Sequence, residues 1–238
     1  MIPKTIHISW KDNSILSDNH MFPKACIQKL ISLAPDWKVE LSTNDTVDDY
    51  LKTQLDSQDW ALLKDCHIVE KLDVWRLLKL YIEGGLYVDI DRLCNTSVND
   101  IITPETKCLL PTCGDNDFSQ DFMCSAAGNP IYAITAQLNL QRRKDGAKNI
   151  YFLGPQTFMH GVTKALVGEI IDVNPGREVF TEIRAVLSKM PFITTYVETS
   201  PYDTILYRPE NQQIEFDHEE MKRDYYEKSN LKHWTGDW

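Results

Sequence analysis

Alternation of apolar and polar positions predicts a strand at the start of the chain. From Lys4 to Trp10 the isoleucines and the tryptophan fall on one side, with His7 and Ser9 on the other, the period of two typical of a half-buried strand. An apolar helix with Pro23 in its first turn follows, and then a second strand. Strand, helix, strand is the order that begins an α/β layer fold.

Further along, helical periodicity is clearest where it leads into a glycine pair. A long helix is expected over 68–83, because Gly84-Gly85 is a typical helix stop and a short apolar strand follows at once. The other predicted helices cover residues 22–33, 44–55, 59–64, 130–141 and 155–167, and the other strands 37–41, 86–91, 107–111, 121–127 and 194–197. The charged stretch 217–230 fits either a solvated helix or a loop.

Composition narrows the class of protein. The 238 residues are 42% hydrophobic and 25% charged, which suits one globular domain without a disordered tract. We expect a single α/β domain with a central mixed, mostly parallel sheet flanked by helices. The formal charge of −10 argues against nucleic acid as a partner, because a phosphate backbone requires a basic surface. The densest basic cluster, 142–144, fits a helix C-terminus.

Cysteine spacing and the chain's beginning bear on the compartment. The six cysteines form no CxxC pair, so a zinc framework is not expected. The first residues are too polar for a signal peptide, and no apolar run approaches the roughly 18 residues of a membrane span. We therefore expect reduced cysteines, no transmembrane segment and a cytoplasmic setting, bacterial or viral.

The helix over 68–83 carries a polar stripe. Glu70, Asp73, Arg76 and Lys79 are each three residues apart and so share one face. From periodicity alone, a solvated face with a weak Asp73–Arg76 ion pair is favoured over a functional site, because charged helix faces usually lie in solvent.

The strand that follows favours a site. Along residues 86–91, Tyr87, Asp89 and Asp91 share one face, at the C-terminal end of an apolar strand. Two close carboxylates repel each other unless a cation lies between them. Mg²⁺ and Mn²⁺ prefer such oxygen ligands, together with substrate phosphates. This end of a strand is also where ligands bind in open α/β sheets.

These residues resemble a known signature. Asp73-x-x-Arg76 and Gly84-Gly85-x-Tyr87-x-Asp89-x-Asp91 are similar to the motifs of the DxD-motif sugar transferases of glycosyltransferase family 32, a GT-A group that includes a yeast initiating mannosyltransferase and is related to clostridial glucosylating toxins. The opening Ile-Pro-Lys-Thr-Ile-His-Ile-Ser-Trp, the pair Gly154-Pro155 and the closing His-Trp-Thr-Gly-Asp-Trp also resemble family segments in the family's order. Asp237 departs from the pattern, which usually has Ser there.

The resemblance implies four catalytic residues, Asp73, Arg76, Asp89 and Asp91. Asp73 and Arg76 would hold hydroxyls or phosphate of the donor. Asp91 would bind Mn²⁺ or Mg²⁺ directly, His233 would complete the metal shell, and Asp89 would contact the ribose or a metal-bound water.

By the same resemblance, Trp10 would lie against the nucleotide base and Trp238 would touch the diphosphate. The predicted substrate-binding residues are Trp10, Ile8, Tyr87, Gln120, Asp121 and Trp238. Gln120 and Asp121 would face the donor sugar or the acceptor.

The implied activity is metal-dependent transfer of a sugar, with retention, from a nucleoside-diphosphate sugar, UDP favoured, to a hydroxyl of a glycan or other acceptor. Residues 1–95 would bind the nucleotide sugar and 96–238 would form the acceptor side with a metal-binding tail. A DxD-aspartate phosphatase is an alternative, although Leu93 stands where that class has Thr or Val. A non-catalytic nucleotide-sugar-binding module is the other.

Overall fold

The computed structural model describes residues 1–17, 21–92, 97–104, 106–113, 117–168, 193–198 and 218–229. Within these ranges the strands form one sheet in the order β2-β1-β3-β6-β4-β5, with β7 also paired to β4. The strands are β1 (Thr5–Ser9), β2 (Lys38–Ser42), β3 (Gly85–Val88), β4 (Cys108–Cys113), β5 (Asp117–Phe118), β6 (Phe122–Ser125) and β7 (Ile193–Glu198).

The sheet is mixed, as the sequence predicts. β1 pairs in parallel with β2 and β3, and β4 pairs in parallel with β7, whereas β3–β6, β4–β6 and β4–β5 are antiparallel. Parallel pairs are therefore not the majority among the described strands. β4, β5 and β6 follow one another closely in sequence, and such short connections lead to antiparallel pairing.

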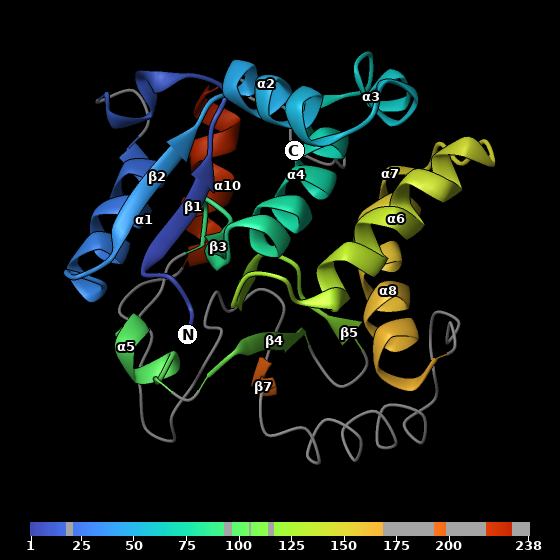
Figure 1. Cartoon of the computed structure of the whole chain (residues 1–238). Helices are drawn as coiled ribbons and strands as arrows, with labels where there is room; N and C mark the ends of the chain where they lie inside the picture. Colours follow the sequence, from blue (N-terminus) through green and yellow to red (C-terminus); the bar gives the residue numbers. More distant parts are fainter. Residues whose placement is uncertain are drawn as a thin grey trace.

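Helices cover both faces of the sheet (Figure 1). One apolar core joins the sheet to α2, α4, α6 and α8, and a second joins the opposite face to α1 and α5; α10 packs on α1 through Tyr225 and Phe22. The helices are η1 (Asn13–Leu16), α1 (Met21–Leu33), α2 (Asn44–Gln54), α3 (Ser57–Leu63), α4 (Ile68–Ile82), α5 (Val98–Ile101), α6 (Pro130–Lys144), α7 (Ile150–Leu153), α8 (Pro155–Val167) and α10 (His218–Ser229).

The glycine pair connects α4 to β3 as expected. Both glycines have positive φ, 71° at Gly84 and 105° at Gly85, values that other residues rarely adopt. A Cβ on Gly85 would lie 2.6 Å from the carbonyl oxygen of Thr5 and 3.0 Å from His7 Nε2. The second glycine therefore lets the start of β3 lie directly against β1.

Three sequence expectations need correction. The strand predicted over 86–91 ends at Val88: Asp89 still donates its N–H to the Asp121 carbonyl of the neighbouring segment, but its own carbonyl accepts the Arg92 N–H in a turn. The cluster 142–144 does end α6, but Arg143 is buried and paired with Glu70 at 2.7 Å. The stretch 217–230, for which a loop was also open, contains helix α10.

The polar stripe of α4 is a further case, because periodicity alone favours a solvated face there. Asp73 and Arg76 are only 3% and 6% exposed, so a solvated face does not explain them. No helix in the described part of the chain is both long enough and apolar enough to cross a membrane.

Candidate active site

A pocket of about 350 Å³ opens beyond the C-terminal ends of β1 and β3. Its walls come from the end of β1, the N-terminal half of α4, the turn after β3 and helix α10. The carboxyl ends of two adjacent parallel strands meet here, which is the usual place for a ligand in an open α/β sheet.

Arg76 is the centre of the polar network beneath the pocket. Its Nη1 donates to Asp89 Oδ1 at 3.2 Å and to the Gln120 carbonyl at 3.0 Å, and its Nη2 lies 3.3 Å from Asp73 Oδ1. The guanidinium also lies 4.7 Å from the centre of the Tyr87 ring. Burial opposes the charge of Arg76, but the surrounding acids outweigh it and raise its pKa. The side chain is therefore a fixed cation that orients its neighbours.

Asp89 is held from two sides. Its Oδ1 accepts the hydroxyl of Tyr87 as well as Arg76, while the side chain stays about one-third exposed to the pocket. Burial is the main cause of the raised pKa of Tyr87, so the phenol remains a donor at neutral pH. These contacts to Oδ1 fix the carboxylate in one orientation.

Asp73 lies behind this network. Its Oδ1 accepts a hydrogen bond from Gln120 Nε2 at 3.2 Å, and a Cβ on Gly154 would lie 2.5 Å from its Oδ2. Burial raises the pKa of Asp73 to about 6, although Arg76 acts in the opposite direction. Gly154 therefore allows α8 to begin directly against a buried carboxyl group.

Asp91 lies at the pocket wall against α10. Lys222 Nζ is 2.9 Å from Asp91 Oδ2, and the Tyr226 hydroxyl donates to the same oxygen at 3.3 Å. Burial, followed by the charge of Asp91, raises the pKa of Tyr226. The C-terminal helix thus contributes a cation and a neutral hydroxyl to the second acid of the motif.

Asp121 forms the remaining wall. It is ion-paired with Arg92 and accepts the Ser119 hydroxyl. Together with the backbone bond between Asp121 and Asp89, this ties the turn after β3 to the start of β6. The motif turn is therefore supported by the strand next to it.

Most of the predicted site residues lie together. Those in the pocket wall are Trp10, Arg76, Tyr87, Asp89, Asp91 and Asp121. Asp73 and Gln120 contact the network from behind. Ile8 is not brought to the pocket: it is 2% exposed and packs in the apolar core. His233, Asp237 and Trp238 lie outside the described residues.

Among the wall residues that sequence reasoning missed, three contact its predicted acids: Arg92 pairs with Asp121, and Lys222 and Tyr226 contact Asp91. Lys222 and Tyr226 are four residues apart, which places them on one face of a helix. That spacing indicates a shared surface, but nothing local to α10 identifies Asp91 as its partner.

The donor set fits a hard divalent cation. Asp89 and Asp91 offer carboxylate oxygens at the edge of a pocket, and these are ligands that Mg²⁺ and Mn²⁺ prefer. The contact of the Lys222 ammonium with Asp91 shows that this position accommodates positive charge.

Comparison with known proteins shows similarity to sugar transferases. Residues 23–108 match the family model described as "Glycosyltransferase sugar-binding region containing DXD motif". Over 104 residues the chain is 33% identical to inositol phosphoceramide mannosyltransferase 3 of Schizosaccharomyces pombe, a match that covers 42% of this chain and 27% of that protein. The chain therefore matches about a quarter of that relative's length.

Among solved structures, the PaToxG glycosyltransferase aligns with 97% of this chain and 87% of its own, with a TM-score of 0.55 and 16% identity, which shows a shared fold. The transferase class predicted from the sequence agrees with all three comparisons. The resemblance that the motifs indicate is thus confirmed for residues 23–108, which are similar to the sugar-binding region of the DXD-motif glycosyltransferases, and the chain shares the fold of a solved glycosyltransferase.

Proposed function

We propose that this protein is a metal-dependent, retaining glycosyltransferase that moves a sugar from a nucleoside-diphosphate sugar to a hydroxyl acceptor. The observation that carries the proposal is the cluster of Arg76, Asp89 and Asp91 at one pocket. The buried Arg76 holds Asp89, and Asp91 lies in the same pocket wall. The two carboxylates suit the metal ion, and the arginine suits the diphosphate, of a ligand that combines both.

Asp91 and Asp89 would hold Mn²⁺ or Mg²⁺, with His233 as a third ligand by family resemblance. When bound, the metal neutralises negative charge that develops on the leaving diphosphate. Arg76 supports this by fixing the orientation of Asp89 through Oδ1. Since Arg76 lines the pocket, its positive field also favours the departing phosphate.

Trp10 would stack on the nucleotide base, and Asp73 with Gln120 would orient the donor sugar behind Arg76. Asp121 would face the sugar or the acceptor, and Trp238 would contact the diphosphate by resemblance. Transfer with retention places the acceptor hydroxyl on the face of the leaving group, so no separate general base on this chain is required.

For the donor we favour UDP-sugars, and the name of the fission yeast relative adds mannose to the sugars worth testing. The acceptor class is a glycan or glycoconjugate hydroxyl, and a cytoplasmic setting remains part of the proposal. The test is a panel of UDP- and GDP-sugars with Mn²⁺, in which released nucleoside diphosphate is measured.

The decisive variant is Asp91→Asn, which keeps the side chain's shape and removes its charge. We expect metal-dependent donor binding to be lost, whereas Asp65→Asn, a change at an exposed carboxyl that is not part of the pocket wall, should leave it intact. Donor affinity that is unchanged in Asp91→Asn would refute the metal role. Absence of both turnover and binding with every donor would refute the proposed function.

A further inference from the structure

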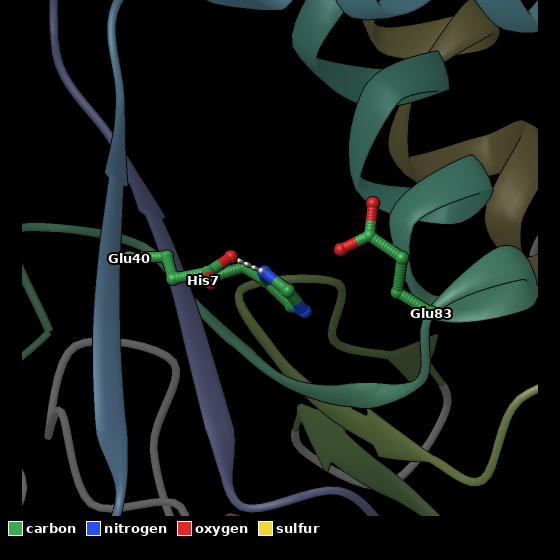
Figure 2. Close-up of side chains that lie close together, drawn as sticks. All are labelled: His7, Glu40 and Glu83. Atoms are coloured by element: carbon green, nitrogen blue, oxygen red, sulfur yellow. Dashed lines mark ion pairs between the residues drawn. The ribbon is translucent and has the colours of Figure 1, made fainter.

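His7, in the opening segment that forms β1, does not line the pocket described above. His7 lies in β1 with its side chain only 1% exposed, on the sheet face that carries α4. Glu40 of β2 and Glu83 at the end of α4 approach the same ring from two sides (Figure 2). One ligand atom from each residue lies within 4.8 Å of the others.

The hydrogen bonding of His7 determines which ring nitrogen is free. Nε2 lies 2.9 Å from the carbonyl oxygen of Gly84. Since a carbonyl can only accept, Nε2 carries the proton, and in the neutral ring Nδ1 is left with a lone pair. Nδ1 is buried and has no hydrogen-bond partner among the described residues.

The free lone pair points toward negative charge. His7 Nδ1 lies 3.7 Å from Glu40 Oε2, and the Glu83 carboxylate completes the triangle. An imidazole lone pair beside one carboxylate and near a second is unfavourable unless a metal ion or a proton lies among them. The arrangement is the one that metal-bound histidines use, with the second ring N–H donated to a backbone carbonyl that fixes the ring.

The glycine pair holds the ring in this position. Gly84 supplies the accepting carbonyl, and the absence of a Cβ on Gly85 leaves room for Nε2. The histidine ligand is therefore rigid, whereas Glu40 and Glu83 are half-buried to exposed and offer a path for an ion from solvent.

Two lysines compensate the carboxylates in part. Lys38 donates to Glu40 Oε1 at 2.6 Å, which leaves Oε2 toward His7. Lys79 donates to Glu83 Oε1 at 2.7 Å and also lies over the Tyr50 ring. Lys79 is therefore the side chain that competes with an ion at this cluster.

We propose that His7, Glu40 and Glu83 form a second divalent-metal site, separate from the DxD pair, that prefers Zn²⁺ with water as the fourth ligand. One imidazole nitrogen and two carboxylates suit a borderline metal better than Mg²⁺ or Ca²⁺. Tetrahedral Zn²⁺ with bonds of about 2.0–2.2 Å holds its ligand atoms roughly 3.4 Å apart. The 3.7 Å between Nδ1 and Glu40 Oε2 already approaches that separation.

The experiment uses the full chain with Asp91→Asn, so that the DxD pair does not contribute. Zn²⁺ is titrated by calorimetry, and Co²⁺ is used for its visible absorption in a four-coordinate site. We expect one tightly bound equivalent, with affinity at least tenfold weaker after Glu40→Gln or Glu83→Gln. Asp65→Asn serves as the matched control and should leave the affinity unchanged.

Lys79→Gln tests the site in the opposite direction, because removal of the competing ammonium should tighten Zn²⁺ binding several-fold. The ring signals of His7 should also shift on Zn²⁺ addition in an NMR spectrum of the protein. A cluster that holds only water would take up no Zn²⁺, and this result would overturn the proposal. Binding that is insensitive to both glutamine variants would overturn it equally.

Discussion

Gly85 provides the sharpest test of how the site is supported. In Gly85→Ala the new methyl would lie 2.6 Å from the Thr5 carbonyl oxygen, so β1 and β3 must move apart. The residue also has φ of 105°, which alanine adopts only with strain. Gly146 is a matched control, because it has φ of 89° and nothing within 4 Å of an added Cβ.

Both variants share the conformational strain, about 1–2 kcal/mol, offset in part by a stiffer unfolded chain. Only Gly85→Ala adds the forced displacement of packed backbone, which costs about 1–3 kcal/mol. We therefore expect a loss of about 3 kcal/mol in the free energy of unfolding for Gly85→Ala and about 1 kcal/mol for Gly146→Ala. Urea titration followed by tryptophan fluorescence measures both. Equal losses in the two variants would refute the close β1–β3 approach.

Three further predictions concern charge. Burial raises the pKa of Asp73 to about 6, so the folded state binds a proton more tightly than the unfolded state and is more stable at low pH. As the pH rises from 5 to 7, the free energy of unfolding of the wild type should fall by about 1 kcal/mol relative to Asp73→Asn, measured by urea titration. A rise over this range would contradict the prediction. Lys222→Ala should tighten Mn²⁺ binding several-fold in calorimetry, because it removes the ammonium that competes with the metal for Asp91; unchanged affinity would count against this. Arg143→Met should lower the free energy of unfolding by about 3 kcal/mol, because it leaves the Glu70 carboxylate without its ion-pair partner. The double variant with Glu70→Gln should recover most of this loss. If the effects of the two substitutions simply add, the two residues do not stabilise the fold as a pair.

The sequence was sufficient where one local signal determined the outcome. The period of two before Trp10 predicted β1, and the glycine pair correctly marked the end of α4. The motif acids were placed at the end of β3 from the same signals. The predicted strand was too long, since β3 ends before Asp89, and the two acids follow it in a turn where side chains from other elements hold them.

The spacing of residues along the sequence could not predict contacts between segments that are far apart in the chain. The periodicity of α4 placed Asp73 and Arg76 on a polar stripe, yet their burial depends on β6 and α8, which are far away in sequence. The contact of Lys222 with Asp91 is of the same kind. Ile8 was expected at the substrate, but strand alternation places it in the core on the opposite face from His7.

The central place of β1 has a consequence for how the chain folds. β1 lies between β2 and β3, and its Ile6 pairs with Leu86, which comes much later in the sequence. During synthesis from the N-terminus, the first strand can pair with β2 early, but its second edge must stay open until β3 has been made. Pairings of such long sequence separation slow folding. Until then β1 exposes an unpaired edge, the kind of edge that invites association between nascent chains.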